Sequence, residues 1–232
     1  MNPFLMIQAA GQVLETGEAE GDVLVEQSIN LFDLMLKGGW IMIPLGVLSV
    51  ISVYIFFERY MVLKRVSKED STFMNRIKDY IHDGKIDSAL ALCSSNDHPI
   101  ARMIEKGISR IGRPLNDVST AIENVGNLEV SRMEKGLPTL ATVAGGAPMI
   151  GFLGTVIGMI KSFWEMSNAG NNIMVDQLAG GIYTALVTTV TGLTVGIIAY
   201  FAYNILVARV EKVVFKMEAR TMEFLDILNE PA

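Results

Sequence analysis

The sequence has 232 residues, half of them hydrophobic, with a positive mean hydropathy and a formal net charge of −6 at pH 7. It contains no basic patch with interleaved aromatic residues, which argues against nucleic-acid binding, and its single cysteine, Cys93, excludes an intramolecular disulfide framework. No cluster of nucleophile, base and orienting group is visible, so we expect this protein to have no enzymatic activity, no cofactor and no bound metal.

Three runs without a charged residue dominate the sequence. They comprise residues 38–57, 137–160 and 177–208, with 20, 24 and 32 residues respectively. Because a helix rises about 1.5 Å per residue, roughly 20 residues cross a hydrocarbon layer ~30 Å thick. We therefore expect an all-α integral membrane protein with three transmembrane helices and long cytoplasmic helical extensions.

The distribution of charge orients these spans. Residues 1–36 carry six acids and no base, whereas residues 58–136 hold 13 Lys or Arg and residues 209–232 hold four more. The positive-inside rule then places the N-terminus outside and the C-terminus inside. The predicted segments are an extracytoplasmic N-terminal segment (1–36), a lipid-facing first span (37–58), a cytoplasmic helical loop (59–136), a second span (137–163), an extracytoplasmic loop (164–176), a third span (177–208) and a cytoplasmic C-terminal helix (209–232).

Local signals predict further helices outside the spans. Apolar residues within 23–36 predict an amphipathic helix at the outer membrane boundary. The inner loop predicts a helix over residues 71–84 capped by Asp70–Ser71, one from Asp87, one over residues 99–112 and one from Pro114. The last is expected to run unbroken into the second span with an apolar stripe formed by Ile122, Val125, Leu128, Met133 and Leu137. The third span is expected to continue past Arg209 as a charged amphipathic helix.

Three isolated residues of the inner loop have no special spacing. We expect Cys93 to be a small buried hydrophobic residue, and His82 and His98 to be solvent-exposed loop residues.

Small residues line one face of the second and third spans. In each span they fall within roughly a 100° arc at 3.6 residues per turn. They are Ala141, Ala144, Pro148, Gly151, Thr155, Gly158 and Ser162 in the second span, and Gly181, Ala185, Thr189, Gly192, Gly196 and Ala199 in the third. Since small residues let helix backbones approach in a bilayer, both spans predict close neighbours on more than one side.

The third span also holds five threonines, at positions 184, 188, 189, 191 and 194. Thr184, Thr188 and Thr191 form a second stripe roughly 90° from the first. Each hydroxyl could donate a hydrogen bond to a carbonyl of the preceding turn, and the residue would then act only in packing. As a set, two polar stripes on one helix favour an oligomer that lines a polar lumen.

No ionisable residue lies deep within any span, and Lys161 and Asp176 fall at the outer boundary. Ionisable groups within the bilayer usually mark proton relays and ion sites. If this chain conducts protons, the titrating acid must therefore come from another polypeptide.

Three stretches of the sequence resemble the ExbB/TolQ/MotA family of proton-channel motor subunits. They read GFLGTVIGMIKSF (151–163), GIYTALVTTVTGLTVGIIAYFAYN (181–204) and SALALC…HPIARMIEKGI (88–108). Three spans with a large inner loop favour the ExbB/TolQ branch. The resemblance implies a homopentamer in the bacterial inner membrane, whose second and third spans line a pore around two ExbD/TolR-like single-span partners that carry a transmembrane aspartate.

The resemblance also implies roles for individual residues. Thr155 and Thr189 would face the partner aspartate, and proton flow would drive movement of the partner and transfer energy to the cell envelope. Family members commonly have glutamate where this sequence has Thr184, so Thr184 and Thr188 would act as neutral relays. The small residues expected to pack along the pore are Ala144, Pro148, Gly151, Gly158, Ser162, Gly181, Ala185, Gly192 and Gly196.

Other functions fit parts of the pattern. A MotA-like or gliding-type stator would share the spans. A non-conducting scaffold for a single-span partner would use the hydroxyls only to hold helices together. A small secondary transporter would predict broken helices, repeats and its own buried charge, and the sequence shows none of these clearly.

Overall fold

The computed structural model describes residues 38–68, 72–168 and 175–229. Every regular element within these ranges is a helix, and three stretches are long and apolar enough to span a membrane. They lie in α3 (Met42–Val66), α8 (Leu137–Asn168) and α9 (Val175–Asn229). The expected all-α fold with three spans is confirmed. The helix predicted over residues 23–36 and the Asp70–Ser71 cap lie outside the described residues.

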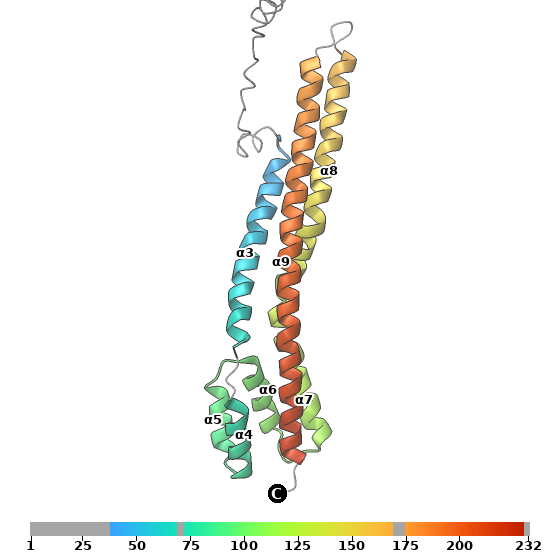
Figure 1. Cartoon of the computed structure of the whole chain (residues 1–232). Coiled ribbons are helices and arrows are strands. Elements are labelled where there is room, and N and C mark those ends of the chain that lie inside the picture. The colour runs from blue at the N-terminus through green and yellow to red at the C-terminus, as the bar shows by residue number, and fades with distance from the viewer. Residues whose placement is uncertain (1–37, 69–71, 169–174, 230–232) are drawn as a thin grey trace, which may run out of the picture. The chain divides into compact units, whose positions relative to one another are not determined.

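The long helices run alongside one another (Figure 1). α8 and α9 are antiparallel and in contact along most of α8, and α3 packs beside α9. Four shorter helices gather around the C-terminal half of α9. They are α4 (Phe73–His82), α5 (Ile86–Ser94), α6 (Pro99–Ile108) and α7 (Leu115–Glu134). α9 continues without a break past Arg209, as expected.

The helix that begins at Leu115 does not run unbroken into the second span, so this prediction is wrong. α7 ends at Glu134 and α8 begins at Leu137. Gly136 between them has a φ of 86°, in the left-handed region that favours glycine. Pro138 follows two residues later and lacks the N–H that a continuous helix would use. α7 and α8 can therefore take different directions at this point.

The apolar stripe predicted along α7 is also only partly correct. Ile122 and Met133 are buried, but Leu128 is 62% exposed. Glu129, the next residue, is buried instead and binds Arg102 of α6. α6 itself ends at Ile108, about one turn before the predicted end at Gly112.

The four shorter helices, α4 to α7, share one hydrophobic core with the end of α9. A Cβ atom on Gly107 of α6 would lie 2.5 Å from the Phe224 ring and 2.7 Å from Ile122. Glycine at this position therefore lets α6 pack closely against α7 and α9. Cys93 is buried in the same core as expected, and its burial raises the pKa of the thiol to about 12.

His98 is not the solvent-exposed loop residue that was predicted. Its Nδ1 accepts a hydrogen bond from the Ile100 N–H at 3.2 Å and so caps the start of α6. Because Nδ1 is the acceptor, Nε2 carries the proton and donates to the Val66 carbonyl at 2.7 Å. His98 thus joins the end of α3 to α6. His82 is exposed as expected, but it is the last residue of α4 and not a loop residue.

Candidate functional site

The small residues of the second and third spans meet one another within one chain. A Cβ atom on Gly192 would lie 2.6 Å from the Ala147 carbonyl oxygen and 2.8 Å from the Gly151 Cα, so the two backbones touch. We call this contact the α8–α9 seam. It includes Ala144, Pro148, Gly151, Gly158 and Ser162 from α8, and Gly181, Ala185, Gly192 and Gly196 from α9. Whether these residues also line a pore stays a prediction.

Thr155 and Thr189 meet at the centre of this seam. Their hydroxyl oxygens are in direct hydrogen-bonding contact, and both side chains are partly buried. Thr155 Oγ1 also lies 3.2 Å from the Ala185 carbonyl oxygen, and Thr189 Oγ1 lies 3.2 Å from that of Gly151. We call these two residues the hydroxyl pair. A hydroxyl donates one hydrogen bond and accepts two, so the pair can exchange donor and acceptor roles.

Thr188 lies directly beside the hydroxyl pair. Its side chain is 1% exposed and packs against Gly154. Its hydroxyl donates to the Ala185 carbonyl at 2.7 Å, the same oxygen that Thr155 approaches. The structure therefore brings three of the four predicted ion-pathway threonines together, and two of them, Thr155 and Thr188, share the Ala185 carbonyl.

Thr184 lies apart from this group. It donates to the Gly180 carbonyl at 3.0 Å and lines a crevice of about 250 Å³ with Lys161 and Glu165. Lys161 Nζ lies 3.9 Å from Glu165 Oε1. We did not predict that Thr184 shares a crevice with charged residues. The i,i+4 spacing of Lys161 and Glu165 was visible in the sequence, but their position opposite Thr184 depends on the packing of two helices.

The remaining two threonines donate hydrogen bonds within their own helix. Thr191 donates to the Val187 carbonyl at 2.9 Å, and Thr194 donates to the Val190 carbonyl at 2.8 Å. Thr194 is exposed. Thr194 therefore offers a control position, because its hydroxyl is on the same helix but separate from the hydroxyl pair.

The α8–α9 seam has no charge of its own, because residues 137–160 and 177–208 contain no ionisable residue of the Asp, Glu, His, Lys or Arg type. Among the residues that the structure describes, no three His, Cys, Asp or Glu side chains are grouped so that they could hold a metal ion. The chemistry available at the hydroxyl pair is therefore neutral donation and acceptance of hydrogen bonds.

Comparison with known proteins places these residues in a wider context. Residues 95–219 match the profile of the family described as the MotA/TolQ/ExbB proton channel family. The chain is 31% identical over 221 residues to the Tol-Pal system protein TolQ of Haemophilus influenzae, a match that covers 88% of this chain and 96% of the relative. It is 28% identical over 200 residues to TolQ of Pseudomonas aeruginosa, covering 82% and 86%. It is 36% identical over 112 residues to the biopolymer transport protein ExbB of Aquifex aeolicus, covering 47% and 74%.

Proposed function

The chain belongs to the MotA/TolQ/ExbB proton channel family, and on that premise we propose that it is the ring-forming subunit of a motor driven by the proton-motive force. In this function the second and third spans of several copies, five if the family pattern holds, surround the membrane helices of a partner dimer. Each partner is an ExbD/TolR-like single-span protein whose span carries an aspartate. The assembly lies in the bacterial inner membrane with the N-terminus of this chain outside.

One observation carries this proposal: the hydroxyl pair lies in a membrane seam that has no ionisable group. A carboxylate at that depth is costly unless polar groups bind it. Thr155 and Thr189 can donate to an ionised carboxylate or accept from a protonated one without becoming charged. The pair therefore provides this chain's contribution to a proton site, and the acid of that site comes from the partner.

The hydrogen bonds around the pair lower the free energy needed for the Thr155 hydroxyl to change its acceptor. When Thr155 turns its hydroxyl toward a partner carboxylate, it leaves the Ala185 carbonyl. That oxygen keeps the hydrogen bond from Thr188 at 2.7 Å, so no buried carbonyl is left without a donor. Thr188 would then act by keeping the backbone satisfied and not by carrying the proton.

Proton movement would follow from the change in charge of the partner acid. A proton from the outer side neutralises the aspartate, the neutral acid passes the apolar part of the ring, and the proton leaves on the inner side. The membrane potential contributes about 2.3 kcal/mol per charge for each 100 mV. The crevice lined by Thr184, Lys161 and Glu165 supplies a polar surface on the outer side in this orientation.

The experiment that tests this function uses the complete complex. The chain is co-expressed with an ExbD/TolR-like single-span partner, and both are reconstituted into liposomes under an applied potential. Proton uptake is expected with the unmodified partner and is expected to vanish when the aspartate of the partner span is changed to asparagine. Uptake that is the same with both partners contradicts the proposal.

A non-conducting scaffold is the second candidate, and one observation favours it. Each of the five threonine hydroxyls of α9 already has a backbone carbonyl acceptor within the chain. Under this function the hydroxyls hold α8 against α9 and against a partner helix. The scaffold predicts partner binding without any proton flux.

A further inference from the structure

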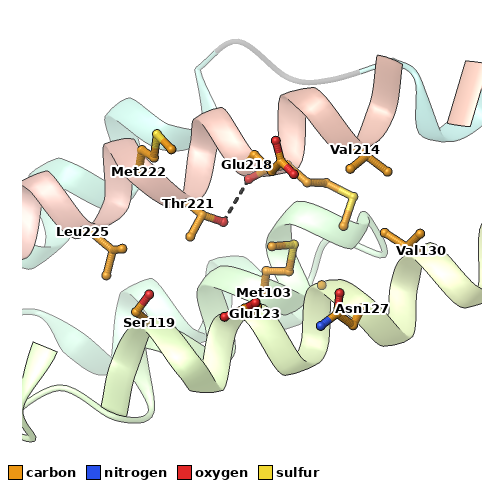
Figure 2. A pocket seen from close by; sticks show the side chains of 12 residues that line it. Met103, Ser119, Glu123, Asn127, Val130, Val214, Glu218, Thr221, Met222 and Leu225 are labelled. Atoms are coloured by element: carbon orange, nitrogen blue, oxygen red, sulfur yellow. Dashed lines mark hydrogen bonds between the residues drawn. The ribbon is translucent and has the colours of Figure 1, made fainter. Parts of the chain in front are cut away.

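A groove lies between α7 and the C-terminal part of α9. α7 and α9 leave a cavity of about 330 Å³ between them (Figure 2). Met103 of α6 lies between the two helices at its floor. A Cβ atom on Gly126 would lie only 3.0 Å from the Met103 Cε, so glycine at this position makes room for the methionine. We call this cavity the α7–α9 groove.

The groove has acidic walls and an apolar floor. Glu123 lies on the α7 wall and Glu218 on the α9 wall, both on exposed positions. No lysine or arginine is among the residues that line it. Methionine side chains such as Met103 and Met217 adapt to differently shaped apolar surfaces. The lining therefore suits a segment that carries both positive charges and apolar side chains.

The groove lies on the same face of α9 as the hydroxyl pair. α9 is unbroken from Val175 to Asn229. Leu225 follows Thr189 by 36 residues, which is ten turns at 3.6 residues per turn, and Glu218 lies only about 20° from that line. α8 covers this face of α9 at Gly192 and Gly196, so the shared direction of Thr189 and the groove gives the axial span that a partner segment must bridge, and not a path along the helix surface. The distance from Thr189 to Glu218 along the helix is about 43 Å.

We propose that the α7–α9 groove binds a cationic amphipathic segment from the cytoplasmic tail of the single-span partner. This inference rests on the proposed function. The positive-inside rule predicts Lys and Arg in the short cytoplasmic tail of such a partner. About 13 extended residues, or a helix of roughly 29, would reach from the hydroxyl pair to Glu218. A second copy of this chain fits less well through α7, because the exposed charges of α7 are three carboxylates and one base and would bring like charges together.

A direct binding measurement tests the charge complementarity. The full chain is placed in nanodiscs of phosphatidylcholine, and a fluorescent 18-residue amphipathic peptide of Leu and Lys is added, with empty nanodiscs as the baseline. Glu123→Gln/Glu218→Gln is expected to weaken binding about tenfold at low salt. Glu134→Gln/Glu211→Gln removes the same charge from the same two helices at exposed positions outside the groove and is expected to have no effect.

A steric variant separates the groove from general surface charge. Asn127→Trp fills the groove without changing its charge and is also expected to weaken binding of the Leu/Lys peptide. Equal affinity of the Glu123→Gln/Glu218→Gln variant and its control overturns the proposal. Equal binding of a Leu/Glu peptide with the same pattern overturns it as well.

Photo-crosslinking in the complete complex distinguishes this inference from the proposed function. A photoreactive amino acid is placed at Thr221 in the groove or at Val156, beside the hydroxyl pair. Both positions are expected to crosslink to the partner, Thr221 to its cytoplasmic tail and Val156 to its span. A partner crosslink at Val156 but none at Thr221, or a Thr221 crosslink to a second copy of this chain, overturns the groove proposal and leaves the proposed function standing. Absence of a partner crosslink at both positions contradicts both.

Discussion

The buried carboxylate of Glu129 accepts two hydrogen bonds from the guanidinium group of Arg102. Nε lies 2.9 Å from Oε1, and Nη2 lies 2.6 Å from Oε2. Arg132 Nη1 adds a third contact at 2.7 Å. The Glu129 side chain is only 4% exposed, and its hydrogen bonds to Arg102 raise the pKa of that arginine further above its already high value. This pair fixes α6 to α7.

Removing the arginine should destabilise the packing of α6 against α7. Arg102→Met leaves the Glu129 charge buried with one remaining partner, and we expect a loss of about 3 kcal/mol. Arg132 is 69% exposed, so Arg132→Met should cost less than about 1 kcal/mol. The rate at which a maleimide labels Cys93 measures the difference, because this buried thiol reacts only when the shared core opens. Equal labelling rates in the two variants would show that the pair does not hold the core.

The close contact of α8 and α9 predicts that an added methyl group lowers stability at one glycine of α8 and not at another. A Cβ atom on Gly151 would lie 2.8 Å from the Thr188 carbonyl oxygen and 3.1 Å from the Gly192 Cα, and backbone atoms cannot move aside as a flexible side chain can. Gly151→Ala should therefore lower stability by about 2 kcal/mol.

Gly145 on the same helix is the matched control. A Cβ atom there meets nothing within 4 Å. Gly145→Ala should be neutral or stabilising by up to about 1 kcal/mol, since alanine favours the helix more than glycine does. Thermal unfolding of the full chain in detergent, followed by circular dichroism, compares the two variants. A Gly151→Ala protein as stable as Gly145→Ala would mean that the seam is looser than described.

The Cys93 thiol should give the protein a stability change at alkaline pH. Burial holds its folded pKa at about 12, above the ordinary value of 9.0. The folded protein therefore keeps this proton while the unfolded chain loses it, so the contribution is present below pH 9 and is lost as the pH rises toward 12. At pH 10.5 the loss should be about 2 kcal/mol.

The pH effect is measured as a difference between two proteins. Unfolding free energies of the unmodified chain and Cys93→Ala are compared at pH 8 and pH 10.5, so that titration of lysines and tyrosines cancels. The advantage of the unmodified chain should shrink at the higher pH. A constant difference would indicate that the thiol ionises normally in the folded protein.

The fold was predictable where a local quantity decides it. The length of the uncharged runs identifies the three spans, because each span must cross the same thickness of bilayer. The break at Gly136 was missed because the apolar pattern continues across it, although Pro138 was a local signal. Burial of Glu129 could not be inferred, since it depends on Arg102, 27 residues earlier on another helix. His98 was misjudged for the same reason, because Val66 is 32 residues away.

The candidate site was predictable in composition but not in pairing. The small-residue stripes indicate close contacts but do not say which helix makes them, and here each stripe meets the other within one chain. The resemblance pointed to Thr155 and Thr189, whereas their mutual contact required the relative depth of two antiparallel helices. The convergence of Thr155 and Thr188 on the Ala185 carbonyl likewise depends on packing that no spacing reveals.

Proton flux through the reconstituted complex after removal of single hydroxyls tests the central claim most directly. Thr155→Val and Thr189→Val keep the side-chain shape but remove the hydroxyl, and each should lower flux at least tenfold while the complex stays assembled. Thr155→Ser and Thr189→Ser should restore most of it, and Thr194→Val, on the exposed side of α9, should leave it unchanged. Full flux in both valine variants, with the partner still bound, would contradict the account.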